Sequence, residues 1–230
     1  LDADDCLGAD KLRLQVEVLE SHPGCVATAR WGRFRLSLED VVFANDDQLH
    51  DWAPLDWLVY HCGQHQMMHP AAWLVPRKVA EQAGPWDERL TLNDDGEYFA
   101  RVVAKSQMLR CVPRAQTFYR TAEGKSLSKS RGRDAFKSLW LSIESTTNVM
   151  LGLGDTLATR RAAADMCQRF IYEVYPSVPE LRMVAGERIQ ALGGSQVRPD
   201  FGPRARLLSR LCGWRAALIF SRFSRKGTPV

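Results

Sequence analysis

Three carboxylates stand within the first five residues of the chain, Leu1-Asp2-Ala3-Asp4-Asp5, directly after an apolar residue. This run is typical of a strand end that delivers acids to the edge of a sheet, where Asp2 and Asp4 share one side. A cation relieves the repulsion between crowded anions. Hard oxygen ligands favour Mg²⁺ or Mn²⁺, with positions left open for phosphate oxygens. The alternative is an acidic surface turn ahead of the next helix.

The composition is that of a folded protein. With 230 residues and 45% hydrophobic side chains, the chain can bury a core and form one domain, or one domain with a small appendage. The six cysteines show no C-x-x-C spacing, which indicates neither a zinc ribbon nor a disulfide framework and fits a reducing cytoplasm. We expect neither a signal peptide nor a membrane span, because the given residues show no leader pattern and no apolar run long enough to span a bilayer. Because the chain opens inside an expected strand without an initiator Met, we expect it to be cut from something longer.

Alternating strand and helix patterns fill the first 130 residues. They predict the following elements: helix 11–20, strands 25–31 and 34–38 around a turn at Gly32-Arg33, strand 71–75, helix 78–83, a helix capped by Asn93 or Asp94, and strands 108–112 and 116–120 around Pro113-Arg114. The remainder, residues 131–230, reads as all-helical, with helices over 133–150, 156–175, 179 to about 192, and 203–222. The first helix is expected to bury Leu12, Val16 and Leu19 on one face.

The charge of the chain is concentrated in its tail. Residues 201–230 carry seven arginines and lysines and no acids, which leaves −3 for residues 1–200 because the whole chain is +4. This distribution argues against a nucleic-acid-binding face over the body of the protein. The basic amphipathic helix expected over residues 203–222 could lie on an anionic membrane, such as the inner face of the plasma membrane. Docking on the domain itself or on a partner is the alternative.

Three histidines recur at four-residue spacing. On a helix running from Asp56, the side chains of His61, His65 and His69 would stack along one side, which suggests a metal cluster. The helix need not extend that far, however, because Pro70 follows. In that case His69 is the histidine that we expect to line a substrate pocket.

A second acidic group, Asn93-Asp94-Asp95-Gly96-Glu97, opens the predicted helix near position 94. The partial positive charge of the helix end favours the carboxylate form of Asp95 in the first turn. A carboxylate at a pocket rim can take the proton of an attacking sugar hydroxyl, which is general-base catalysis. Capping alone is the other interpretation, although a single acid would be enough for it.

A polar segment, residues 123–129, places Ser126 and Ser128 next to lysines. Such a loop could fold over a diphosphate and neutralise a leaving group. The alternative is a solvated linker.

Taken together, these motifs resemble the C-terminal half of family 2 glycosyltransferases of the A-type fold, over residues 1 to about 130. The resemblance is carried by Leu1-Asp2-Ala3-Asp4-Asp5, Ala72-Trp73-Leu74-Val75-Pro76-Arg77, Gly84-Pro85-Trp86-Asp87-Glu88, Asn93-Asp94-Asp95-Gly96-Glu97, Thr117-Phe118-Tyr119-Arg120 and Ser126-Leu127-Ser128.

The resemblance implies a metal-assisted, inverting transfer of a sugar from a nucleotide-diphosphate donor to the hydroxyl of a carbohydrate or lipid-linked acceptor. It implies a Mn²⁺ or Mg²⁺ ion on a D-x-D motif and one general base. The metal ligands would be Asp2, Asp4 and Asp5, the base Asp95, and the substrate-binding residues Asp94, Trp73, His69, Arg120, Ser126 and Ser128.

Two features depart from the family pattern. Asp94-Asp95 stands where Glu-Asp is usual, which leaves the candidate base in place. Family members also carry roughly a hundred residues before the D-x-D, in a Rossmann-like half that holds the nucleotide. The expected fold class is therefore a truncated A-type mixed sheet flanked by helices (residues 1–130), followed by a helical region (131–230). Little activity is expected unless the missing half is supplied.

Two rival functions remain open from the sequence. One is a non-catalytic carbohydrate-binding or scaffold module that retains the fold, and the other is a metal-dependent hydrolase. Geometry separates the first from an enzyme, since Asp4 and Asp95 must face one pocket for transfer.

Overall fold

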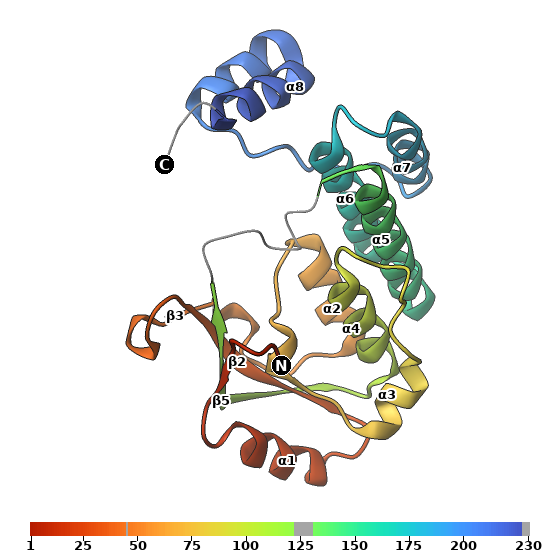
Figure 1. Cartoon of the computed structure of the whole chain (residues 1–230). Helices are drawn as coiled ribbons and strands as arrows, with labels where there is room; N and C mark the ends of the chain where they lie inside the picture. Colours follow the sequence, from red (N-terminus) through yellow and green to blue (C-terminus); the bar gives the residue numbers. More distant parts are fainter. Residues whose placement is uncertain (45, 122–130, 227–230) are drawn as a thin grey trace.

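The structure, a computed structural model, describes residues 1–44, 46–121 and 131–226, and side chains as far as residue 222. It contains a mixed five-stranded sheet whose strands follow the order β1-β5-β2-β3, with β4 also pairing with β2 (Figure 1). The strands are β1 (Cys6–Leu7), β2 (Val26–Phe34), β3 (Val42–Phe43), β4 (Trp73–Leu74) and β5 (Leu109–Arg120). β2 and β5 run parallel, while the other pairs are antiparallel. The prediction of a mixed α/β fold is confirmed at this level.

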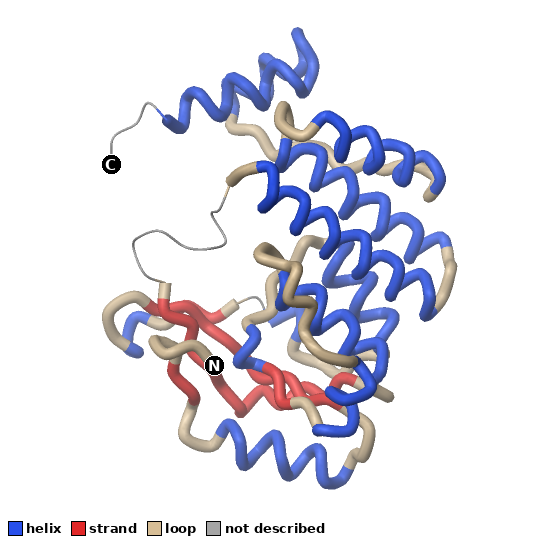
Figure 2. The backbone as a smooth tube through the Cα atoms, turned by 45° about the vertical axis from the view of Figure 1, so that its right-hand side comes forward, coloured by secondary structure: helices blue, strands red, loops and turns tan. Residues whose placement is uncertain are grey.

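Helices cover both faces of the sheet. They are α1 (Lys11–Ser21), α2 (Pro54–Gly63), α3 (Arg77–Ala83), α4 (Asp94–Lys105), α5 (Arg133–Leu153), α6 (Leu157–Val174), α7 (Pro179–Ala191) and α8 (Pro203–Lys226). α1 lies on one face of the sheet and α2 and α4 on the other, with α5 to α7 stacked beyond them (Figures 1 and 2). Among the described residues, no helix has the length and apolar character needed to cross a membrane.

The predicted turn at Gly32-Arg33 is wrong. Both residues lie inside β2, which continues to Phe34 and pairs Gly32 with Phe118 of β5. A Cβ on Gly32 would lie 2.7 Å from Cγ1 of Val41, so the glycine admits the close approach of the segment that leads into β3. Gly32 is therefore required by close packing between strands and not by a turn.

The predicted turn at Pro113-Arg114 is a bulge. β5 is one strand, but its register against β2 jumps from Val112 opposite Ala29 to Gln116 opposite Arg30. Pro113 has no N–H to donate to a ladder, which suits it to the unpaired residues of a bulge.

The buried face of α1 also differs from the prediction. Leu12 and Val16 are 52% and 43% exposed, whereas Lys11 and Gln15 are buried. Lys11 Nζ and Gln15 Nε2 donate to backbone carbonyls at residues 73 and 72, at 3.4 and 3.0 Å. The polar residues of α1 therefore hold the short β4 segment, a tertiary demand that helical periodicity does not reveal.

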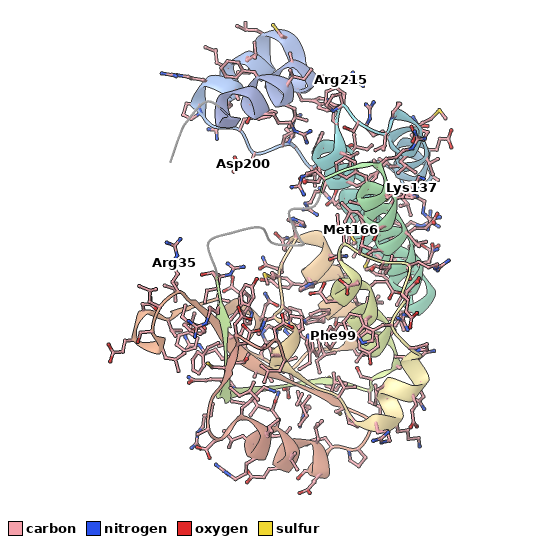
Figure 3. The ribbon with its side chains drawn as sticks, viewed as in Figure 1. Arg35, Phe99, Lys137, Met166, Asp200 and Arg215 are labelled. Atoms are coloured by element: carbon pink, nitrogen blue, oxygen red, sulfur yellow. The ribbon has the colours of Figure 1, made fainter. Side chains whose placement is uncertain are left out.

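The helical region shares the core of the sheet region. One hydrophobic cluster joins Val26 of β2, Trp57 of α2 and Val102 of α4 with Met150 of α5 and Ala162 of α6. Met166, labelled in Figure 3, packs against both this cluster and a second one inside α5 to α7. The boundary expected at residue 130 lies at the end of residues 122–130, outside the described part of the chain.

Candidate functional site

A cavity of about 230 Å³ opens between α2, the N-terminus of α4 and the segment that follows α2. It is lined by Trp57, His61, His65, Gln66, Met67, Met68, Trp73, Asn93, Asp95, Gly96 and Phe99. Aromatic faces with a few convergent polar groups are typical of small-ligand sites.

Aromatic rings build one wall of this cavity. Trp73 stacks on Phe99 with ring centroids 4.9 Å apart, and it meets the ring of Trp57 edge-on at 5.3 Å. Trp57 in turn stacks on His61 at 4.2 Å. Within the described structure, Trp73 Nε1 and His61 Nδ1 are buried without a hydrogen-bond partner. A polar ligand in the cavity would be a natural partner for such groups.

The three histidines do not stack along a helix, and the alternative, a helix that ends before His69, is confirmed. α2 ends at Gly63, and His65 takes a left-handed conformation with φ +54°. His69 lies beyond that bend, directly before a 3₁₀ turn. Across the described residues, no three His, Cys, Asp or Glu side chains are grouped so that they could hold a metal ion. His61 and His65 nevertheless line the same cavity.

Asp5 and His69 form a buried pair. Asp5 Oδ2 lies 2.9 Å from His69 Nε2, and the two side chains are only 1% and 3% exposed. The other oxygen, Oδ1, accepts the backbone N–H of Arg120 at 2.9 Å. Burial lowers the pKa of His69, although Asp5 and Asp2 oppose that shift. Both oxygens of Asp5 are engaged in fastening the chain start to β5, which leaves Asp2 and Asp4 as the exposed acids.

Arg120 clamps the same region. Its Nε donates to the carbonyl of Asp4 at 3.0 Å and its Nη1 to the carbonyl of Arg35 at 3.1 Å. Its guanidinium also lies 4.4 Å from the ring centroid of Phe34. The residue expected to bind substrate thus ties the N-terminus to the end of β2.

Asp95 occupies the first turn of α4 and lines the cavity. Its Oδ1 accepts the N–H of Gly96 at 2.7 Å. The N–H groups of the helix end do favour the carboxylate form of Asp95, as expected, but burial outweighs them and the net pKa is raised. Burial raises the pKa of Asp95, Asp94 adds to this, and the Gly96 N–H and His69 only partly oppose it. A raised pKa makes a stronger base.

One imidazole is coupled electrostatically to both acidic groups. His69 interacts electrostatically with Asp95 and also with Asp2 and Asp5, which are more than 60 residues away in the sequence. Asp2 and Asp4 are nevertheless not among the residues that line the cavity of Asp95.

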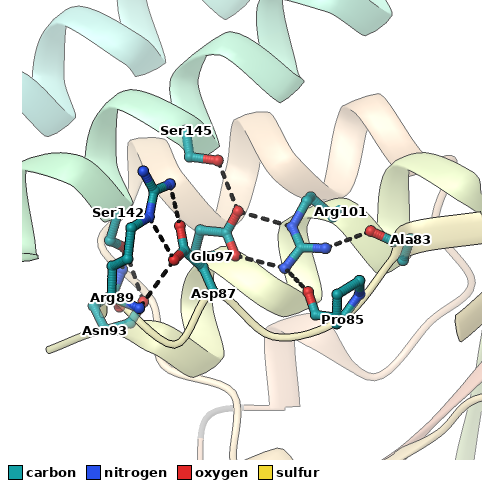
Figure 4. Close-up of polar contacts among 9 residues, drawn as sticks. All are labelled: Ala83, Pro85, Asp87, Arg89, Asn93, Glu97, Arg101, Ser142 and Ser145. Carbon is teal, nitrogen blue, oxygen red and sulfur yellow. Dashed lines mark hydrogen bonds and ion pairs between the residues drawn. The ribbon is translucent and has the colours of Figure 1, made fainter. Parts of the chain in front are cut away.

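A row of serines on α5 holds the segment that leads into α4, a feature that the sequence interpretation missed. The serines recur at spacings of four and three residues, which puts them on one helix face. Ser138 Oγ accepts from Thr91 N (2.7 Å) and Leu92 N (3.1 Å). Ser142 Oγ exchanges hydrogen bonds with Asn93 Nδ2 (2.6 Å) and O (2.8 Å), and Ser145 Oγ donates to Glu97 Oε1 (2.7 Å) (Figure 4). The spacing of these serines is the sequence signal from which the contact face of α5 could have been predicted.

Replacing Ser142 by alanine is expected to lower the free energy of unfolding by about 1–2 kcal/mol, because it leaves Asn93 without two hydrogen bonds. The matched control on the same helix is Thr146→Val, since the buried Thr146 hydroxyl has no partner in the described structure. Valine should be neutral or stabilising there. Urea unfolding of both variants measures the difference, and equal costs would show that the Asn93 contacts contribute nothing.

Acidification is expected to destabilise the chain through His61. Burial, aided by His65, lowers the pKa of His61 from 6.5 to about 4. The unfolded chain thus binds a proton below pH 6.5 while the folded chain does not, so stability falls from pH 6.5 to about 4, by up to about 3 kcal/mol. His61→Phe should flatten this fall and exposed His50→Phe should not. The measurement is the free energy of unfolding between pH 6.5 and about 4. If its slope against pH were the same in His61→Phe as in the unaltered chain, His61 would not be the group responsible.

Comparisons with known proteins give no further guide, since no family model, curated protein or solved structure matches the chain. Of the predicted site residues, the structure gathers Trp73 and Asp95 on one cavity and links His69 electrostatically to Asp95. Ser126 and Ser128 lie outside the described residues. The run Leu1–Asp5 is not a strand end as predicted but forms the alternative, a turn ahead of β1, and the ligand roles of Asp2 and Asp4 stay predictions.

Proposed function

We propose that this chain contributes the acceptor side and the general base of a nucleotide-sugar-dependent glycosyltransferase of the A-type fold, acting in the cytoplasm with inversion. The observation that carries the proposal is an aromatic-lined cavity that holds Asp95, with His69 coupled electrostatically both to Asp95 and to the acids of the chain start. Asp2 and Asp4 are not among the residues that line this cavity, so their part in transfer rests on the sequence resemblance.

The cavity suits the acceptor. A sugar ring presents C–H groups to aromatic faces and hydroxyls to polar atoms, and the cavity supplies the Trp57, Trp73 and Phe99 rings together with Asn93 and Gln66. The unpartnered Trp73 Nε1 would donate to a hydroxyl or ring oxygen. Asp95 would accept the proton of the hydroxyl that attacks the donor carbon, while the bond from that carbon to the diphosphate breaks.

The exposed carboxylates of Asp2 and Asp4 fit a Mg²⁺ or Mn²⁺ ion. These ions are commonly held by one or two carboxylates together with substrate phosphates. Asp5 does not fit, because both of its oxygens are already engaged. The bound ion would neutralise charge on the leaving diphosphate. In this proposal Asp5, His69 and Arg120 position the chain start without touching the substrate.

The test is transfer from a panel of nucleotide-diphosphate sugars with Mn²⁺, using the longest form of the protein that its coding sequence provides. Asp2→Asn/Asp4→Asn should abolish transfer and its dependence on Mn²⁺, whereas Asp134→Asn/Asp200→Asn, at exposed acids, should not. Sugar release that needs no acceptor would point to a hydrolase. Saturable sugar binding without turnover would point to a binding module.

A further inference from the structure

α8 stands at the end of the molecule that is farthest from the sheet (Figures 1 and 2). It is interrupted at Gly213, where φ is +80°, so that its two halves pack on one another. Phe201 and Ala205 bury against Ala217 in that contact. The inner side of this hairpin is therefore already used.

A second side of α8 is docked on the end of α6. The guanidinium of Arg222 donates to the backbone carbonyls of Tyr172, Glu173 and Tyr175. Trp214 meets the rings of Tyr172 and Tyr175 edge-on, with centroids 5.0 and 5.2 Å away. These contacts fix which residues of α8 stay outside.

The side that remains outward combines apolar and cationic residues. Leu207 and Leu211, one helical turn apart, are 60% and 75% exposed, and the exposed Arg204 and Arg210 flank them on the helix surface. In the second half, Ile219 is 38% exposed, while the guanidinium of Arg215 lies 4.9 Å from the ring centroid of Trp214, the residue that docks α8 on α6. Apolar residues bordered by arginines are typical of helices that lie in a membrane interface.

The charge distribution favours an anionic lipid surface over other partners. Residues 201–230 carry +7 with no acid, while the rest of the chain is net negative. Nucleic acid would account for the arginines but leave the leucines without a role. We propose that α8 lies in the headgroup region of an anionic bilayer, with Leu207 and Leu211 at the acyl boundary and Arg204 and Arg210 against lipid phosphates. The proposal is independent of the proposed enzymatic function.

Flotation of the full chain with vesicles tests this assignment. Vesicles of phosphatidylcholine with 30% phosphatidylglycerol should carry the chain, and pure phosphatidylcholine vesicles should not. Leu207→Gln/Leu211→Gln should weaken the partition by at least about tenfold, while Leu36→Gln/Leu157→Gln, at leucines that are 88% and 84% exposed, should not. Arg204→Gln/Arg210→Gln should weaken it roughly thirtyfold. Removing Arg77, Lys78 and Arg114, exposed basic residues elsewhere, should have little effect.

A fluorophore on the exposed Cys212, between the two halves of α8, reports insertion directly, and circular dichroism confirms that each variant is folded. Its emission should shift to the blue with anionic vesicles only. Three results would overturn the proposal: no flotation, flotation that needs the arginines but not the leucines, or self-association that the leucine variant abolishes. The second would indicate a general polyanion surface and the third a protein interface.

Discussion

Replacement of Asp95 by asparagine is expected to lower the rate of sugar transfer by about 10²–10⁴-fold, the range of a lost general base. Asparagine keeps the size of the side chain and an oxygen that can accept the Gly96 N–H, which Asp95 now binds at 2.7 Å. Acceptor affinity should therefore change little while turnover falls. An unchanged turnover in the assay described above would remove Asp95 as the base.

The pH dependence gives a second readout at the same residue. Because the pKa of Asp95 is raised, its protonated form persists above the usual range for aspartate, and transfer should fall on the acidic side at a correspondingly higher pH. The neighbouring Asp94 contributes to that shift. Asp94→Asn should move the acidic limb to lower pH without removing turnover, since the base is still present. A limb that does not move in Asp94→Asn would contradict this coupling.

Asp95→Asn should also stabilise the fold at neutral pH, which is a readout independent of activity. A buried carboxyl whose pKa is raised destabilises the folded state when it is ionised and ceases to do so once it is protonated. The gain, roughly 2–4 °C in Tm if it amounts to about 1 kcal/mol, should thus fade as the pH approaches the ordinary pKa of aspartate. A variant that loses both turnover and stability would have lost its fold rather than its base.

Local patterns were sufficient where a segment is shaped by its own sequence. The helix expected over residues 133–150 is α5, Arg133–Leu153, and the helix placed after Pro179 is α7. The acidic group near position 95 does open a helix, α4. In each case apolar periodicity or a proline at the first turn carries the signal.

Long-range contacts decided the features that the sequence did not reveal. Gly32 was predicted to form a turn because the local pattern does not show its crowding neighbours. These are Val41 and Phe43, which come later in the sequence. The serine row on α5 binds groups 46 to 49 residues earlier in the chain. Burial of Asp95 likewise depends on tertiary packing, and it outweighs the helix-end effect that local reasoning favoured.

The ion pair between Glu97 and Arg101 presents the largest expected effect on stability. Arg101 Nε and Nη2 contact the two oxygens of Glu97 at 2.8 and 2.9 Å, and the guanidinium also donates to the carbonyls of Ala83 and Pro85 (Figure 4). The side chains of Glu97 and Arg101 are 4% and 20% exposed, respectively. This one arginine therefore joins the first turns of α4 to the end of α3.

Arg101→Ala is expected to cost about 2–4 kcal/mol of unfolding free energy, because it leaves a buried carboxylate whose remaining side-chain donor is Ser145 at 2.7 Å. The matched control is Arg160→Ala, which breaks the ion pair with Asp155, where both side chains are about half exposed (47% and 51%). A pair of that kind contributes about 0–1 kcal/mol. Glu97→Gln/Arg101→Ala should cost less than Arg101→Ala alone, since no charge is then left unpaired. Equal losses of unfolding free energy, measured by urea unfolding, for Arg101→Ala and Arg160→Ala would mean that the contacts of Arg101 do not hold α3 against α4. In that case Glu97→Gln/Arg101→Ala should cost as much as Arg101→Ala, because no unpaired charge contributes to the loss.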